Sequence, residues 1–391
     1  MKLVVIGLGQ CGGRIADEFA RLNRKAISQR GIEIVNSAFA VNTDVADLSG
    51  LRRVKPDFEH RILIGSRKTG GHGVGKINEL GAEVAKEDAD KVIDAIRSTK
   101  RLPEADAFLL IAGAAGGTGS GAIAIMTHYI KQRFGDKPVY NLIVLPFEHE
   151  EETEERTIYN AATCLKSSYL VADAVILFDN QRYYRKDASL KKNLDNINAL
   201  IAAPFYNLLC AGEEKKHKYI GSKVLDAGDI IQTFVGWTIM GHSRSSISFL
   251  RSFFARTRDF RKKVAETQKG IQSMDEALGR LSVHGNPAES RRALYLVSAP
   301  AREMNMDLMS ELGIYLKGLA PEAIIRSGDY PRDDGAMDVV VVLSELSDVA
   351  KIREYFKKTI GLISVLQKRQ ESTDTGYTEL DGSLKDIPSL L

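Results

Sequence analysis

The chain has 391 residues, of which 44% are hydrophobic and 27% are charged, and a formal net charge of +3, proportions typical of a folded protein with two domains. No apolar run approaches the roughly 18 residues of a membrane span, no CxxC pair suggests a disulfide framework or zinc site, and so small a net charge does not indicate nucleic-acid binding. We therefore expect a cytoplasmic protein with no nucleic-acid partner and no direct membrane insertion.

Short apolar strands alternate with helical stretches through the first half of the chain. Strands are predicted at 3–7, 39–44, 61–65, 106–113, 139–147 and 174–180, and helices at 14–25, 77–98, 119–134 and 153–170. This alternation, with strands apolar on both faces, is typical of a parallel sheet covered by helices on each side. We predict an α/β fold with a doubly wound, mostly parallel sheet in a Rossmann-like nucleotide-binding domain at residues 1–186.

The second half changes in character. A long central helix is predicted at 187–212, with a bend or local break at Pro204, followed by a loop and a helix at 213–240. Beyond it we predict a basic helical region at 244–279, strands at 292–299, 323–327 and 337–345, and helices at 304–319 and 348–369. These elements indicate a smaller α+β domain at 241–368. Residues 369–391 are polar and are predicted to be a flexible tail.

Three glycine-rich runs follow predicted strands, at the sheet edge where doubly wound proteins bind ligands. The first begins at Gly7 and matches GxGxxG, but the acidic residue expected about 20 positions later is missing, because the nearest candidate is Asp44. The second ends at Lys76 and resembles a P-loop, except that Ile77 replaces the hydroxyl residue that binds magnesium. An NAD-dependent oxidoreductase and a glycine turn without a ligand remain as alternatives here.

The third run, AGAAGGTGSG at 112–121, joins a strand to a helix. Its main-chain amides can converge at the helix N-terminus, an arrangement suited to a phosphate chain. The run contains no lysine, so we expect it to bind through the main chain, with added hydroxyl donors from Thr118 and Ser120. The alternative is that its glycines only allow close packing of helices.

Ala115 to Gly121 resembles the GGGTGSG signature of the tubulin/FtsZ superfamily, with alanine in place of the first glycine. Residues 9–12 (GQCG) are similar to the opening of tubulin, and residues 42–44 and 70–75 resemble the second and third nucleotide loops of FtsZ. Because tubulin-like and FtsZ-like features are mixed over residues 1–365, the chain is most similar to the archaeal tubulin-like CetZ group. The resemblance implies a GTPase that uses GTP/GDP and Mg²⁺, and we assign no side chain as a metal ligand.

The resemblance also implies the nucleotide-binding residues. Asn180 and Asn198 would bind the guanine edge, since an amide offers both a donor and an acceptor, and Leu194 takes the place of the tyrosine that tubulin stacks on the base. Glu150 would contact the ribose, and Arg156 is a candidate for the phosphates, although it lies further from Pro146 than in FtsZ. The full expected set is Gly9, Gln10, Cys11, Gly12, Asn42, Asp44, Gly71, Gly73, Gly113, Ala114, Gly116, Gly117, Thr118, Gly119, Ser120, Glu150, Asn180, Leu194 and Asn198.

Asp226 and Asp229 are the predicted catalytic residues. They lie in a segment that resembles the NxDxxD loop with which FtsZ completes the active site of a neighbouring subunit, although Val224 replaces the asparagine. In the family this loop lies at the far end of the central helix from the nucleotide, about 35 Å away, so catalysis requires a head-to-tail homopolymer. From the residues alone, the favoured interpretation is that these acids cap a helix.

Three further points stay open in the sequence. A nucleotide-bound polymer scaffold with negligible hydrolysis is an alternative to the GTPase, because the loop asparagine is missing. The basic stretch from Arg244 to Lys263 raises nucleic-acid binding, but its spacing favours an amphipathic helix. The resemblance implies a role in archaeal cell shape or division, in filaments that can lie near the cell envelope. We find no anchoring motif, so attachment there would need an adaptor protein.

Overall fold

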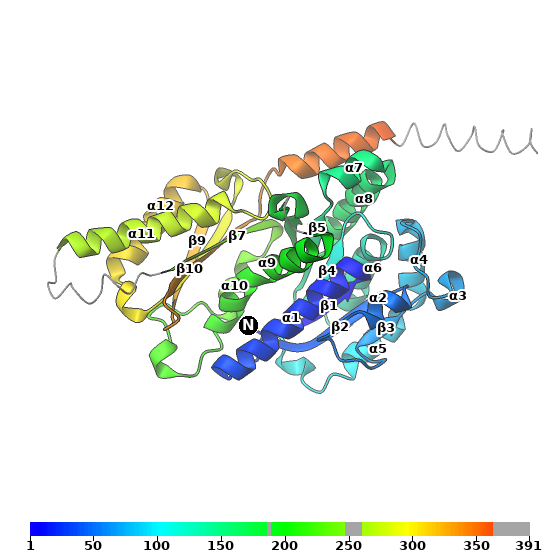
Figure 1. The fold of residues 1–391 in the computed structure, drawn as a ribbon, viewed down its shortest axis with the longest axis horizontal. Coiled ribbons are helices and arrows are strands. Elements are labelled where there is room, and N and C mark those ends of the chain that lie inside the picture. The colour runs from blue at the N-terminus through cyan, green and yellow to red at the C-terminus, as the bar shows by residue number, and fades with distance from the viewer. Residues whose placement is uncertain (186–188, 247–259, 363–391) are drawn as a thin grey trace, which may run out of the picture.

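The computed structural model describes residues 1–185, 189–246 and 260–362 of the chain. The predicted tail at 369–391 and most of the basic stretch lie outside the described residues. In the described part, ten strands form one sheet with the order β3-β2-β1-β4-β5-β6-β7-β10-β8-β9 (Figure 1). The strands are β1 (Leu3–Leu8), β2 (Val35–Asn42), β3 (Arg61–Leu63), β4 (Ala107–Gly113), β5 (Val139–Leu145), β6 (Ala174–Asp179), β7 (Gly236–Ser246), β8 (Arg292–Ala299), β9 (Ile324–Pro331) and β10 (Ala336–Ser344).

Strands β1 to β6 pair in parallel, and β7 pairs in parallel with β6. Strand β10 is antiparallel to both β7 and β8, and β8 is parallel to β9. The helices are α1 (Gly9–Arg30), α2 (Val45–Ser49), α3 (Ser66–Thr69), α4 (Asn78–Glu87), α5 (Ala89–Arg97), α6 (Thr118–Arg133), α7 (Glu148–Thr153), α8 (Glu155–Val171), α9 (Leu190–Ala211), α10 (Ala227–Thr233), α11 (Phe260–Gly279) and α12 (Met306–Leu319), with a further helix at 350–362.

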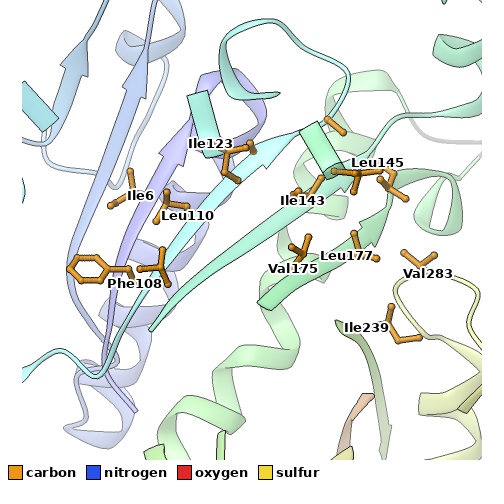
Figure 2. Packing of buried hydrophobic residues seen from close by; sticks show 14 of the residues in the cluster. Ile6, Phe108, Leu110, Ile123, Ile143, Leu145, Val175, Leu177, Ile239 and Val283 are labelled. Atoms are coloured by element: carbon orange, nitrogen blue, oxygen red, sulfur yellow. The ribbon is translucent and has the colours of Figure 1, made fainter. Parts of the chain in front are cut away.

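The sheet is buried on both faces, because successive side chains of a strand point to opposite sides. Val4 and Ile6 of β1 enter one hydrophobic core, whereas Leu3 and Val5 enter the other. The first core lies under α4, α6 and α8 and continues past β6 to Ile239 of β7 (Figure 2). The second core lies under α1 and α9. Both cores therefore continue across the two halves of the chain.

Helix α9 lies between the two halves of the molecule (Figure 1) and packs against α1, where the rings of Phe19 and Phe205 meet edge to face at 5.2 Å. It runs unbroken from Leu190 to Ala211 with Pro204 inside it, so the local break expected at this proline does not occur. A proline removes one backbone hydrogen bond from a helix. Here buried neighbours such as Ile201 and Leu208 hold the helix in place.

The structure corrects the sequence prediction around β7. Residues 244–246 belong to a strand and not to a helix, and the boundary expected between residues 240 and 241 lies inside that strand. Ile239 and Met240 enter opposite cores, which is the two-residue period of a strand. Arg244 forms ion pairs with Asp334 at 2.8 Å and Asp338 at 3.3 Å.

The structure also corrects the single helix predicted at 77–98, which is in fact two helices, α4 and α5.

Candidate functional site

A cavity of about 370 Å³ opens at the carboxyl ends of β1, β2, β4, β5 and β6. The parallel pairing of these strands places the loops that follow them at one edge of the sheet. Most of the predicted site residues line this cavity: Gly9, Gln10, Cys11, Asn42, Asp44, Gly73, Gly113, Gly116, Gly117, Thr118, Gly119, Glu150, Asn180, Leu194 and Asn198. The first, second and third glycine runs all contribute to it.

Four predicted residues do not line the cavity: Gly12, Gly71, Ala114 and Ser120. Gly12 is where α1 approaches β4, and a Cβ atom there would lie 2.0 Å from the carbonyl oxygen of Ile111. The main-chain oxygen of Gly71 accepts a hydrogen bond from the amide of Val45. Ala114 is fully buried, and the Ser120 hydroxyl donates back to the carbonyl of Gly116. These residues support the cavity wall instead of facing into it.

The third glycine run has two structural roles. Gly116, Gly117 and Gly119 line the cavity, whereas Gly121 packs against α4, where an added Cβ atom would lie 2.1 Å from the Asn78 carbonyl oxygen. Close helix packing therefore explains the end of the run. The Thr118 hydroxyl lies 2.6 Å from the hydroxyl of Thr43, which connects the run to the end of β2.

Asp47, which sequence reasoning missed, fixes two predicted side chains. Its carboxylate accepts hydrogen bonds from the side-chain amides of Gln10 at 2.6 Å and Asn42 at 3.1 Å. Asp44 caps α2 by accepting from the main-chain amides of Ala46 and Asp47 at 2.8 and 3.0 Å. The start of α1 and the end of β2 are thereby held together at the cavity wall.

The remaining residues that line the cavity were also not predicted: Leu8, Arg14, Lys76, Ala115, Val144, Pro146 and Phe147. Arg156, the predicted candidate for the phosphates, is not among the lining residues. Its guanidinium group forms an ion pair with Glu79 and packs over the ring of Tyr159 at 5.0 Å. The structure instead places two basic residues there, Arg14 and Lys76, and the position of Lys76 at the end of the second glycine run was the available signal for it.

Asn160 of α8 holds two of the loops together. Its side-chain amide is fully buried and donates to the carbonyl oxygens of Lys76, Ala115 and Gly116 at 2.8, 3.0 and 3.2 Å. The hydrogen bonds of this one side chain therefore join the second and third glycine runs.

Burial raises the pKa of two groups at the cavity, the thiol of Cys11 and the carboxyl group of Asp179. Cys11 is partly exposed to the cavity, but burial of its thiol raises the pKa to about 12, and the charge of Glu150 acts in the same direction. The thiol thus stays protonated at neutral pH and is a poor nucleophile. Burial also raises the pKa of Asp179, which precedes the lining residue Asn180.

The two predicted catalytic aspartates lie elsewhere. Asp226 is exposed and caps α10, where its carboxylate accepts from the main-chain amide of Asp229 at 2.9 Å. Asp229 forms an ion pair with Arg326 at 2.8 Å. Asp226 also packs against the end of α9, since a Cβ atom on Gly212 would lie 3.0 Å from its Cα atom. The cap predicted from the sequence is therefore present.

Helix α9 spans the distance between the cavity and these aspartates. Leu194, in the first turns of α9, lines the cavity, whereas Gly212 follows its last residue. This distance along the helix is about 27 Å at about 1.5 Å per residue. Within one chain the structure does not bring Asp226 and Asp229 to the other predicted site residues.

Two further features are absent from the part of the chain that the structure describes. It contains no helix with the length and apolar character needed to cross a membrane. It also contains no group of three or more histidine, cysteine, aspartate or glutamate side chains arranged to hold a metal ion.

Known proteins resemble the chain over most of its length. The GTPase domain of the Tubulin/FtsZ family matches residues 2–187, and the C-terminal domain of tubulin-like CetZ proteins matches residues 187–361. Tubulin-like protein CetZ1 of Haloferax volcanii is 34% identical over 371 residues, which cover 90% of each chain. The chain belongs to the tubulin/FtsZ family.

Solved structures of CetZ proteins show the same fold. CetZ1 of Haloferax volcanii, as a GDP-bound monomer, superposes with a TM-score of 0.79 at 30% identity, over 93% of this chain and 99% of that one. CetZ2 of the same organism, as a GTPγS-bound protofilament, gives a TM-score of 0.79 at 26% identity, over 94% and 100%. The predicted fold, the resemblance and the GTPase activity are confirmed, and the alternative of an NAD-dependent oxidoreductase is wrong.

In this GTPase domain, Asn160→Leu is expected to lower the free energy of unfolding by about 1–3 kcal/mol, because buried carbonyl oxygens lose their donor. It is also expected to weaken GTP binding, since the hydrogen bonds that join the two loops are lost. Denaturant unfolding and titration with a fluorescent GTP analogue measure the two effects.

Thr127→Val is the matched control, because its buried hydroxyl bonds to the carbonyl of Ile123 at 2.8 Å and to Asn141 at 2.7 Å, away from the cavity. It should lower stability without changing GTP affinity. Equal losses of GTP affinity in both variants would contradict the role given to Asn160.

Proposed function

We propose that the protein binds GTP in the cavity, assembles head to tail with copies of itself and hydrolyses GTP where two copies meet. The observation that carries this proposal is the separation of the cavity from Asp226 by the length of α9. A site whose two parts lie at opposite ends of one chain is completed by a second chain. Contacts of this kind do not close on themselves, and they generate an open filament.

Exposed apolar side chains beside both parts of the site support a head-to-tail contact between two chains. Val45 and Ile77, next to the lining residues Asp44 and Lys76, are 49% and 47% exposed. Near the aspartates, Val224 is 40% exposed and Ile324, on the strand of Arg326, is 68% exposed. Apolar side chains that lie open in one chain are covered when two chains stack.

The cavity residues have distinct proposed roles. Main-chain amides of Gly116 to Gly119, at the N-terminus of α6, hold the phosphates. Glu150 contacts the ribose, while Asn180 and Asn198 bind the guanine edge beside Leu194. Two CetZ structures, one bound to GDP and one bound to GTPγS, support a guanine nucleotide as the ligand.

Hydrolysis needs a positioned water and stabilisation of the charge that develops on the phosphate. In the proposed filament, Asp226 of the neighbouring chain orients the attacking water and accepts its proton, with Asp229 beside it. The main-chain amides of the glycine run stabilise the phosphate oxygens as the bond to the leaving group breaks.

Mg²⁺ fits the side chains at the cavity. Asp44 and Asp47 provide carboxylate oxygens and Gln10 an amide oxygen, the hard donors that Mg²⁺ prefers. The described residues form no complete protein cage, in keeping with an ion bound mainly through phosphates and water. When bound, it would neutralise charge on the phosphates.

We further propose that the filaments act in archaeal cell shape or division, in the cytoplasm and near the envelope, with a separate adaptor protein for attachment. The support is the identity shared with archaeal CetZ proteins. No nucleic-acid partner is part of this proposal.

Electron microscopy and phosphate release test the proposal together. With GTP, filaments and phosphate release should both begin above the same threshold protein concentration. GDP should give few filaments, and ATP should give neither filaments nor phosphate release. A release rate per molecule that is constant down to strictly monomeric dilution would contradict the shared site.

A further inference from the structure

Lys76 has a backbone conformation that is unusual for a lysine. Its φ of 61° lies in the left-handed region, and the only other described non-glycine residue with a positive φ is Glu345. Glycine adopts this conformation freely, whereas lysine does so at a cost in free energy. The turn itself does not need a lysine, so what Lys76 adds is its side chain, which lines the cavity.

The main chain of Lys76 is fixed against the third glycine run. Its carbonyl oxygen accepts a hydrogen bond from Asn160 at 2.8 Å. A Cβ atom on Gly117 would lie 2.9 Å from the carbonyl carbon of Lys76, so the two loops are in direct contact. The ammonium group therefore starts from a fixed point beside the proposed phosphate cradle.

The cavity has few positive charges with which to bind phosphate, and the ammonium group of Lys76 is one of them. Among the described lining residues, three are acidic, Asp44, Asp47 and Glu150, and two are basic, Arg14 and Lys76. Arg14 also lines a neighbouring cavity together with Leu194 and Asn198, at the end proposed for the base. Lys76 is thus the basic side chain beside the glycine run.

The ammonium group of Lys76 forms an ion pair with Glu154, which lies between α7 and α8. The two side chains are 41% and 42% exposed, and an ion pair so open to solvent contributes little stability. A phosphate group, with more charge and more acceptor oxygens than a carboxylate, competes well for the same ammonium.

We propose that Lys76 binds the γ-phosphate and distinguishes GTP from GDP, and that Glu154 holds its ammonium group when the γ-phosphate is absent. This inference rests on the proposed binding of GTP in the cavity. Arg156 does not line the cavity, and its guanidinium group pairs with Glu79 and packs on the ring of Tyr159.

Competition between GDP and GTPγS tests the proposal, measured below the threshold for assembly so that neighbouring chains do not contribute. The parental protein should prefer GTPγS. Glycine and asparagine both tolerate a positive φ. The Lys76→Gly and Lys76→Asn variants should therefore fold, and each should lose about 10-fold or more of the preference for GTPγS because a charge-assisted contact is lost. Their thermal stability should be equal to or above the parental value, because the backbone strain is relieved.

Glu154→Gln is the matched variant. It should increase the preference for GTPγS by freeing Lys76, and it should have no effect on that preference in a Lys76→Gly background. Lys76→Arg should retain most of the preference.

A folded Lys76→Gly variant with the parental preference would overturn the inference and leave GTP binding intact. A parental protein that binds neither nucleotide would overturn the proposed function as well.

Discussion

An Asp226→Asn variant is expected to bind GTP and to assemble, yet to hydrolyse GTP about 100- to 10,000-fold more slowly than the parental protein. Asparagine keeps the side-chain oxygen that accepts from the amide of Asp229, so the cap of α10 is preserved. What is lost is the carboxylate that accepts the proton of the attacking water. Phosphate release above the assembly threshold, together with filament counts by electron microscopy, measures the effect.

The control is Asp348→Asn, which makes the same change in charge at an ion pair with Arg353, away from both parts of the site. It should hydrolyse GTP at close to the parental rate. Asp226→Ala adds a second comparison, because it removes the cap as well and should lower stability by about 0.5–2 kcal/mol. If Asp226→Asn released phosphate at the parental rate, the proposed role of this carboxylate would be wrong.

Several of the predicted residues that the structure brings to the cavity lie at strand ends. Gly9, Asn42 and Gly113 each lie at or next to the end of an apolar strand. Parallel pairing brings such ends to one edge of a sheet regardless of their separation in sequence. Local sequence patterns were therefore sufficient to predict that these residues lie around one cavity.

Asp47 and Lys76 were not identified because their roles depend on distant contacts. Asp47 matters through its bond to Gln10, 37 residues away, which forms only when α2 folds back over the start of α1. Lys76 stands alone as the cation beside the glycine run because Glu79 holds Arg156. The contact of Asp47 has no pattern in the local sequence, and the only local signal for Lys76 was its position at the end of the second glycine run.

Strand β7 was missed for a related reason. Its long antiparallel partner is β10, and the pairing joins Ser246 to Ala336, 90 residues later. The segment GWTIMGHSRSS contains glycine and serine with few β-branched residues, so its local preference for a strand is weak. Burial of Ile239 and Met240 in the two cores decides its structure.

Two variants that are inactive alone are expected to restore hydrolysis when they are mixed, if the site is shared between chains. Asp226→Asn keeps an intact cavity. Gly117→Ala keeps an intact Asp226, but its Cβ atom would lie 2.5 Å from Val74 and 2.9 Å from the main chain of Lys76 and Ile77, so the second glycine run must shift. We expect this shift to disrupt GTP binding.

In an equal mixture, about a quarter of the head-to-tail contacts join an intact cavity to an intact aspartate loop. The mixture should therefore recover up to about a quarter of the parental rate, and the rate should depend on the mixing ratio with a maximum near equal amounts. The control is a chain that carries both substitutions, because mixing it with either single variant creates no complete site. Failure of the two single variants to restore activity, although both enter the same filaments, would place the whole reaction within one chain.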